Sequence, residues 1–235
     1  MVFFLRSSAA RRAAPGQGIR PRLAARWLAG LLLGLLGILG PCMGLDNARL
    51  LEAAARLGPH AAAEAPLLLQ TIARAALLDE DQRLALVNDF FNQHIAFKDD
   101  LEVWGKIDYW ASPLESLGKG AGDCEDYAIA KYFSLVAAGM PVARLRMVYV
   151  RAMVGGRSLA HMVLAYYAQP GAEPLILDNL IPELRPASRR PDLQPVFSFN
   201  SEGLWQGVGN TSNGDPLVRL SQWRDLIAKV RAEGF

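Results

Sequence analysis

The sequence predicts an α+β fold, with helices first and an antiparallel sheet after them. Residues 45–93 are rich in Ala and Leu and repeat their apolar residues at helical spacing. After about residue 144, runs of strand-forming residues follow one another, separated by turn residues. No internal repeat appears, so we expect one domain in which the N-terminal helices pack against the sheet.

Two or three helices are expected within residues 45–93, with breaks near Gly58-Pro59 and at Pro66. Residues 99–123 are expected to form a loop-rich segment. A core helix is expected over about 124–138, because apolar residues recur there at helical spacing until Gly139-Met-Pro141.

The second half of the chain is expected to supply the sheet and a last helix. Residues 200–216 are rich in Gly, Asn and Ser and are typical of a loop, and Ser221 to about Glu233 is typical of a terminal helix. The expected strands lie near 144–153, 161–168, 174–178 and 195–199.

The first 44 residues have the composition of an export signal. They hold six arginines and no acid, followed by an apolar run over Trp27–Leu39. A run of about a dozen residues is shorter than the roughly 17–25 that cross a bilayer. The exit Gly40-Pro-Cys-Met-Gly44 is an imperfect cleavage site. We therefore assign 1–44 to a signal peptide or N-terminal membrane anchor and 45–235 to the domain.

Without this segment the chain is slightly acidic. It keeps 19 of its 25 basic residues against 23 acids, a net charge of −4 in place of +2. An acidic balance provides no electrostatic footprint for nucleic acid, so we expect none as a partner. Loss of Cys42 with the signal would leave Cys124 alone, with no disulfide within the mature chain.

Cys124 stands at the predicted start of the core helix, in Gly122-Asp-Cys-Glu-Asp-Tyr127. A thiol at a helix N-terminus lies near the positive end of the helix dipole, which favours the thiolate. A lone cysteine is usually an inert packing residue. Three neighbouring carboxylates are a poor environment for packing, so we interpret Cys124 as a candidate nucleophile. Asp123 is expected to cap the helix, with Glu125 and Asp126 in its first turn.

Three histidines are available as its base. His60 follows Gly58-Pro59 in an Ala-rich segment and is expected at a surface helix start. His94 is expected to be a packing or helix-end histidine. His161 differs, because it opens the strand-forming run His161–Tyr167, which is followed by a second run at 174–178.

These two runs place His161 and Asp178 together if they form a hairpin. With a turn centred near residue 169.5, paired positions sum to about 339, so that His161 lies opposite Asp178. Directly paired residues point to one face, with Cβ atoms roughly 4.5–5.5 Å apart. Asp178 would then accept from one imidazole nitrogen and leave the other to face the thiol. Cys124, His161 and Asp178 are therefore a candidate acyl-transfer triad, although a one-residue slip would separate the pair.

With these residues the chain resembles the transglutaminase-like (papain-like) cysteine peptidase fold, and within it the bacterial transglutaminase-like cysteine proteinases of the LapG type. The resemblance runs from about Asp89 to Trp205. The segments that carry it are Phe90–Phe97, Trp104–Pro113, Ala121–Phe133, Ala160–Tyr167, Leu175–Asn179 and Pro195–Asn200.

The resemblance implies a periplasmic, calcium-dependent endopeptidase that clips a large surface adhesin near its N-terminus, after a paired-alanine site, and so disperses a biofilm. It also implies a partner, an inner-membrane cyclic-di-GMP receptor of the LapD type that sequesters the protease. The family triad falls on Cys124, His161 and Asp178, and the family's calcium-binding acids fall on Asp123 and Glu125.

The charges around Cys124 give an independent reason for a cation. The acids on either side of Cys124 would raise the pKa of its thiol if nothing compensated them. A hard divalent cation held by carboxylate oxygens would offset this effect. The same acids can also simply complement the helix N-terminus. No EF-hand pattern is present, and the role of Asp126 stays open.

Three functions are compatible with these residues. The first is the calcium-dependent endopeptidase; the second is transglutaminase or amidase-type acyl transfer on the same triad, since water and an amine compete for one acyl-enzyme. The third is a non-catalytic binding module, against which the complete triad counts. The backbone N–H of Cys124 is the expected first oxyanion donor, and the second is left open among Trp104, Trp110, Asn92 and Gln93.

Overall fold

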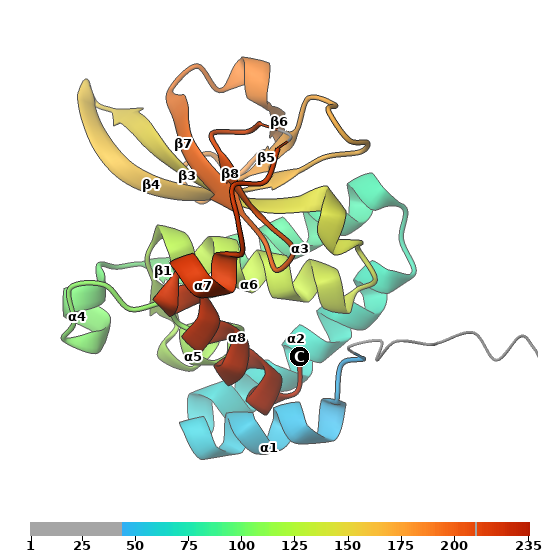
Figure 1. Cartoon of the computed structure of the whole chain (residues 1–235). Helices are drawn as coiled ribbons and strands as arrows, with labels where there is room; N and C mark the ends of the chain where they lie inside the picture. Colours follow the sequence, from blue (N-terminus) through green and yellow to red (C-terminus); the bar gives the residue numbers. More distant parts are fainter. Residues whose placement is uncertain (1–43, 210) are drawn as a thin grey trace, which may run out of the picture. The chain divides into compact units, whose positions relative to one another are not determined.

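The helices of the domain gather on one face of a six-stranded sheet, as the sequence predicts (Figure 1). The computed structural model describes residues 44–209 and 211–235. The predicted signal or anchor segment and Cys42 lie outside these residues, apart from Gly44. The boundary between 1–44 and the domain therefore stays a prediction. Within the described residues, no helix combines the length and the apolar character needed to cross a bilayer.

Three helices open the domain: α1 (Asn47–Leu57), α2 (Pro59–Ala76) and α3 (Glu80–His94). The predicted break at Gly58 is confirmed, because this residue separates α1 from α2 with a φ of 123° that favours glycine. The predicted break at Pro66 is wrong, since Pro66 lies inside α2. An interior proline costs about 3 kcal/mol. The buried apolar face of α2 on either side of it offsets that cost.

The predicted core helix is α6 (Cys124–Ala137), which lies under the sheet with helices on its other sides (Figure 1). Its middle is buried all round, from Asp126 to Leu135. A helix that is enclosed on all faces is held by packing rather than by its own propensity. This enclosure gives the first turn of α6, and hence Cys124, a rigid support.

The segment before α6 is more ordered than the loop that the sequence predicts. It contains α4 (Asp100–Trp104) and α5 (Pro113–Lys119), and α5 begins with a capping box between Ser112 and Glu115. A short parallel pair joins β1 (Ala96–Phe97) to β2 (Ala121–Gly122). The pair ties the end of α3 to the residues immediately before Cys124.

The sheet has the strand order β6-β5-β4-β3-β7-β8 and is antiparallel throughout. The four predicted strands are confirmed, and two short edge strands, β6 and β8, join them. The strands are β3 (Leu145–Val154), β4 (Arg157–Tyr166), β5 (Leu175–Leu177), β6 (Arg185–Pro186), β7 (Leu193–Phe199) and β8 (Leu204–Gln206); two 3-10 turns are η1 (Val142–Arg144) and η2 (Ala187–Arg189).

The register of β4 and β5 differs from the predicted one. Leu164 lies opposite Leu177 and Tyr166 opposite Leu175. Continued pairing would put Asp178 two residues from His161, opposite Val163, so the predicted direct pair is wrong. Side chains alternate with a period of two, and a shift of two therefore keeps both residues on one face. The turn between the strands spans Gln169–Ala172, so its centre lies one residue later than the predicted one, and paired positions such as Leu164 and Leu177 sum to 341 in place of 339.

The chain ends with α7 (Pro216–Arg219) and α8 (Ser221–Glu233), and the predicted terminal helix is thereby confirmed. The fully buried Trp223 of α8 contacts the rings of Tyr132, Phe133 and Phe199 at centroid distances of 5.2 to 5.7 Å. This aromatic cluster joins α6, α8 and β7. It holds the helical layer against the sheet at the second half of α6.

Candidate active site

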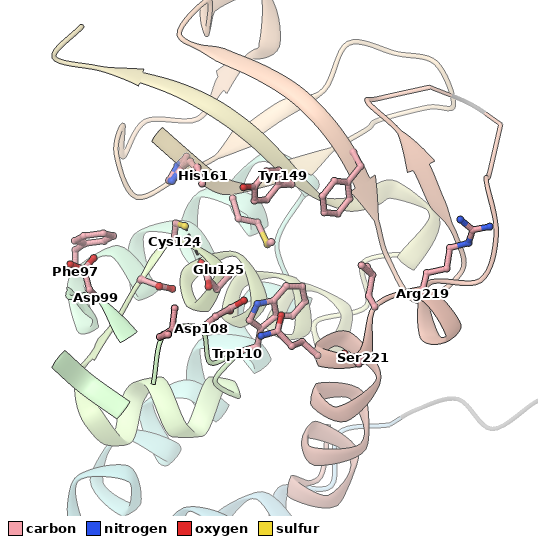
Figure 2. Close-up of a pocket in the computed structure, with 17 residues that line it drawn as sticks. Phe97, Asp99, Asp108, Trp110, Cys124, Glu125, Tyr149, His161, Arg219 and Ser221 are labelled. Carbon is pink, nitrogen blue, oxygen red and sulfur yellow. Dashed lines mark hydrogen bonds between the residues drawn. The ribbon is translucent and has the colours of Figure 1, made fainter. Parts of the chain in front are cut away.

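A cavity of about 600 Å³ opens where the first turn of α6 meets the sheet (Figure 2). Its walls come from the loops beside α4, from α6, from β3, β4 and β7, and from the junction of α7 and α8. The residues that line it include Asp108, Trp110, Asp123, Cys124, Glu125 and His161. The cavity therefore brings together residues that lie far apart in the sequence.

Cys124 is the first residue of α6 and is partly buried. Its Sγ–H donates to Glu125 Oε2 at 3.0 Å. Burial, and then the negative charge and hydrogen bond of Glu125, raise the pKa of the thiol above its usual value. Burial and the charge of Glu125 therefore outweigh the helix dipole that was predicted to favour the thiolate.

Asp123 occupies the N-cap position of α6, but its side chain makes no capping hydrogen bond. The predicted capping role is therefore wrong. Its Oδ1 is buried and has no hydrogen-bond partner. A buried carboxylate oxygen without a partner is costly, so helix capping does not explain the orientation of the Asp123 side chain.

His161 lies on β4 and its Nε2 is 2.8 Å from Asp178 Oδ1, just beyond β5. Both residues are buried, with 5% and 2% exposure. Burial alone would raise the pKa of Asp178, but the hydrogen bonds and positive charges of His161 and Arg190 lower it to about 2. An ionised Asp178 can only accept, so Nε2 carries a proton and Nδ1 is the nitrogen that is free to accept another. Figure 2 shows the Cys124 sulfur beneath the His161 ring.

Asp178 is held from three other elements. Its backbone oxygen accepts from Asn92 Nδ2 of α3 and from Lys131 Nζ of α6, both at 3.0 Å. Its Oδ2 accepts from Arg190 Nη2 at 2.7 Å. Sequence reasoning missed Arg190, because nothing in the run Ser188-Arg-Arg-Pro191 indicates which arginine turns inward.

Five carboxylates form overlapping groups near the start of α6. Three groups each place their ligand atoms within 4.8 Å of one another: Asp123, Cys124 and Glu125; Asp100, Asp123 and Asp126; and Asp100, Asp108 and Glu125. In three of these carboxylates one oxygen is buried without a hydrogen-bond partner, namely Asp100 Oδ1, Asp123 Oδ1 and Asp126 Oδ2. The predicted metal ligands Asp123 and Glu125 thus lie in one cluster, and Asp126 joins them.

Burial and mutual repulsion perturb these acids strongly. The pKa of Asp100 is raised to about 6 and that of Asp123 to about 9, in both cases chiefly by burial and then by neighbouring charges. Burial also raises the pKa of Asp126 well above its usual value. Asp100 and Asp108 were missed at the sequence level; the acids of residues 99–108 were a signal, but sequence alone did not show that this segment folds back onto α6.

The other histidines lie where the sequence predicts. His60 is exposed at the start of α2, and its Nδ1 lies 2.8 Å from the Leu117 oxygen. His94 ends α3, stacks on Phe90 at 4.1 Å and makes a hydrogen bond with the Phe90 oxygen. Neither lines the cavity that holds Cys124.

Of the side chains considered as second oxyanion donor, Trp110 is the one that lines the cavity. The Nε1 of Trp104 is buried without a partner, and the ring packs against Tyr109. The amide of Asn92 donates to the Asp178 backbone. Trp110 is therefore the candidate donor whose side chain lies at the wall of the cavity.

Comparisons with known proteins agree with this fold. The family described as bacterial transglutaminase-like cysteine proteinase (BTLCP) matches residues 69–194. LapG of Legionella pneumophila, solved after treatment with EGTA, is similar with 37% identity and a TM-score of 0.70, covering 80% of this chain and 98% of that one. Its calcium-bound form is similar with 36% identity and a TM-score of 0.69, covering 79% and 99%. No curated protein matches the chain significantly.

Proposed function

Because this chain belongs to the bacterial transglutaminase-like cysteine proteinases of the LapG type, we propose that it hydrolyses peptide bonds with a Cys124, His161 and Asp178 triad. The observation that carries the proposal is the convergence of these residues. Cys124 and His161 line one cavity, and the imidazole is oriented by a 2.8 Å hydrogen bond to a buried carboxylate.

The chemistry follows from the positions of the protons. Nδ1 of His161 takes the thiol proton, and the Cys124 sulfur attacks the scissile carbonyl to form a tetrahedral intermediate. His161 then gives its proton to the leaving amine, which leaves an acyl-enzyme. Water deprotonated by His161 hydrolyses the thioester and restores the thiol. Asp178 keeps the ring in the required tautomer and stabilises its charged form.

The oxyanion of the intermediate requires donors at the same place. The backbone N–H of Cys124 lies at the N-terminus of α6, where amide groups have no partner within the helix. We assign the second donor to the indole of Trp110. Its ring is fixed by Phe199 and Trp223, at 5.7 and 6.5 Å, so that the donor is positioned before substrate binds.

The acidic cluster fits a calcium ion. Ca²⁺ takes six to eight oxygen ligands, mostly from carboxylates and carbonyls. The cluster offers buried oxygens that lack partners, and burial followed by the charges of neighbouring acids raises the pKa of Asp123. The residues that would hold the ion are Asp100, Asp108, Asp123, Glu125 and Asp126. When bound, the cation supplies positive charge beside Cys124, which favours the thiolate.

Glu125 connects this cluster to the nucleophile. Its Oε2 accepts a hydrogen bond from the Cys124 thiol, with Sγ and Oε2 3.0 Å apart, and its charge adds to burial in raising the thiol pKa. In the absence of a cation, the carboxylate therefore holds Cys124 in its protonated and unreactive form. This competition between Glu125 and His161 for the thiol supports a calcium-dependent activity.

We further propose that the substrate is the N-terminal region of a large surface adhesin, cut after a paired-alanine site in the periplasm, so that the adhesin is released and biofilm disperses. The proposed regulator is an inner-membrane cyclic-di-GMP receptor of the LapD type that sequesters the protease. These assignments extend to this chain what the resemblance to proteinases of the LapG type implies.

The experiment is cleavage of an adhesin N-terminal fragment by the purified protein, with calcium or with a chelator. We expect chelator-sensitive cleavage that is lost in Cys124→Ala and kept in the exposed control Asp225→Asn. Incorporation of an added amine without cleavage would instead indicate acyl transfer. The absence of both cleavage and amine incorporation in the presence of calcium would refute the catalytic role.

A further inference from the structure

Arg190 connects the proposed triad to a part of the chain that sequence motifs do not single out. It follows η2 and precedes β7, and it is 2% exposed. Its Nη2 donates to Asp178 Oδ2 at 2.7 Å and to Asp192 Oδ2 at 2.8 Å, and its Nε donates to Asp192 Oδ1 at 3.1 Å. Asp192 therefore holds the guanidinium in place while Arg190 holds Asp178.

The two oxygens of Asp178 have separate partners. Oδ1 accepts from His161 Nε2 and from the backbone N–H groups of Asn179 and Leu180, at 2.7 and 3.2 Å. Oδ2 has Arg190 as its side-chain donor. Since the Asp178 side chain is fully buried, water cannot replace that donor. Without Arg190 the carboxylate would gain from turning Oδ2 toward other donors, and Oδ1 would leave the imidazole.

The charge of Arg190 acts in the same direction. A buried carboxylate tends to take up a proton, and a neutral Asp178 would not stabilise the imidazolium that forms when Cys124 loses its proton. The guanidinium is always charged and presents a planar fork, so it keeps Asp178 both ionised and oriented.

We propose that Arg190 is a positioning residue for catalysis, which holds the Asp178 carboxylate in the orientation that the His161 imidazole requires. The inference rests on the role proposed above for Asp178. Arg190 itself acts through Asp178, and no contact of its own with Cys124 is involved.

The experiment measures two rates in the calcium-loaded protein: alkylation of Cys124 by iodoacetamide, which needs no peptide substrate, and cleavage of the adhesin fragment. The variants are Arg190→Met, Asp178→Asn and the double variant. Asn200→Ala is the structural control, because Asn200 is buried and holds the Val142 and Leu145 carbonyls without contact to Asp178.

We expect Arg190→Met to lower both kcat and the alkylation rate at least tenfold, with KM within twofold of wild type. In the Asp178→Asn background, the same substitution should have less than a twofold further effect, because its partner is already lost. Arg190→Lys keeps the charge without the fork and should recover part of kcat. Asn200→Ala should lose thermal stability but keep both rates.

Equal losses from Arg190→Met in both backgrounds would overturn the inference, as would wild-type rates in folded Arg190→Met. If Arg190→Met alone does not fold, two other comparisons test the inference. Arg190→Lys is compared with wild type, and the double variant, which lacks both buried charges, is compared with Asp178→Asn. Failure of the proposed triad is distinguishable, since Asp178→Asn would then leave the alkylation rate unchanged.

Discussion

The substitution Asp126→Asn is expected to stabilise the calcium-free protein and to weaken its response to calcium. Asp126 is fully buried, its Oδ1 accepts from the Ala111 N–H at 2.8 Å, and its Oδ2 has no partner. An asparagine keeps the acceptor at Oδ1 and replaces the unpaired oxygen by an amide that can donate to Asp100 or Asp123. The change therefore removes a charge without removing the hydrogen bond.

The magnitude follows from the spacing of the cluster. Asp100, Asp123 and Asp126 place oxygens within 4.8 Å of one another. At an effective dielectric constant of about 20, two unit charges at this distance repel by about 3 kcal/mol. Protonation relieves part of this repulsion, because the pKa values of Asp123 and Asp126 are raised. A net gain of about 1–2 kcal/mol without calcium corresponds to a Tm increase of about 3–6 °C for a domain of this size.

Calcium is expected to stabilise Asp126→Asn less than it stabilises the wild-type protein. Asp126 is one of the carboxylates proposed to hold the ion, and its loss should weaken calcium binding at least tenfold, or about 1.4 kcal/mol. Since the free energy that a ligand adds to stability depends on its dissociation constant, the calcium-induced rise in Tm should be smaller than in wild type.

The assay is thermal denaturation followed by circular dichroism, in chelator and over a calcium titration. Asp225→Asn is the matched control, because this exposed aspartate contacts Arg224 and lies outside the cluster. A lower Tm of Asp126→Asn in chelator, or a calcium-induced shift equal to that of wild type, would refute the reasoning.

Trp110→Phe removes the proposed indole donor, so kcat on the adhesin fragment should fall about 10²-fold with little change in KM. An unchanged kcat would exclude this donor. Trp104→Phe is the control, because the Trp104 ring lies outside the cavity. Glu125→Gln removes the charge that raises the pKa of Cys124, so alkylation of Cys124 in chelator, followed by mass spectrometry, should be several-fold faster; an equal or slower rate contradicts this role. Burial raises the pKa of Glu233 from 4.5 to about 7, so the folded state retains a proton that the unfolded chain has released. The stability from this proton is complete below about pH 4.5 and is lost as the pH rises to about 7. Glu233→Gln should therefore raise the free energy of unfolding at pH 8 by about 1–2 kcal/mol, measured by urea denaturation; parallel pH profiles of the two proteins would contradict this assignment.

Much of the fold was predictable because its signals are local. Helical spacing of apolar residues identified α6 and α8, and strand-forming runs bounded by turn residues identified β3, β4, β5 and β7. The failure at Pro66 has a tertiary cause, since the packing of α2 outweighs a local breaker. The predicted register of β4 and β5 was wrong because the Gln169–Ala172 turn is centred one residue later than predicted, which shifts every pair by two positions.

The residues of the candidate site also divide into those with a local sequence signal and those placed only by long-range contacts. Cys124 was identifiable because a helix start and its flanking acids are adjacent in the sequence. The pairing of His161 with Asp178 survived a wrong register, since a shift of two residues preserves the face of a strand. Asp100, Asp108 and Arg190 were not predictable as neighbours of the site, because their role depends on contacts with α6 and Asp178 across long stretches of chain.

By itself, then, the sequence determined the order of helices and strands, and it was enough to propose Cys124 as the nucleophile and His161 as its base. Only the tertiary structure decided which acids form one cluster with Glu125, that Trp110 lines the cavity, and that Arg190 holds Asp178. The physical reason is the distance along the chain over which each effect acts. Propensity, periodicity and helix dipoles act over a few residues, whereas the charge of a buried carboxylate is controlled by whichever groups the fold brings within hydrogen-bond distance.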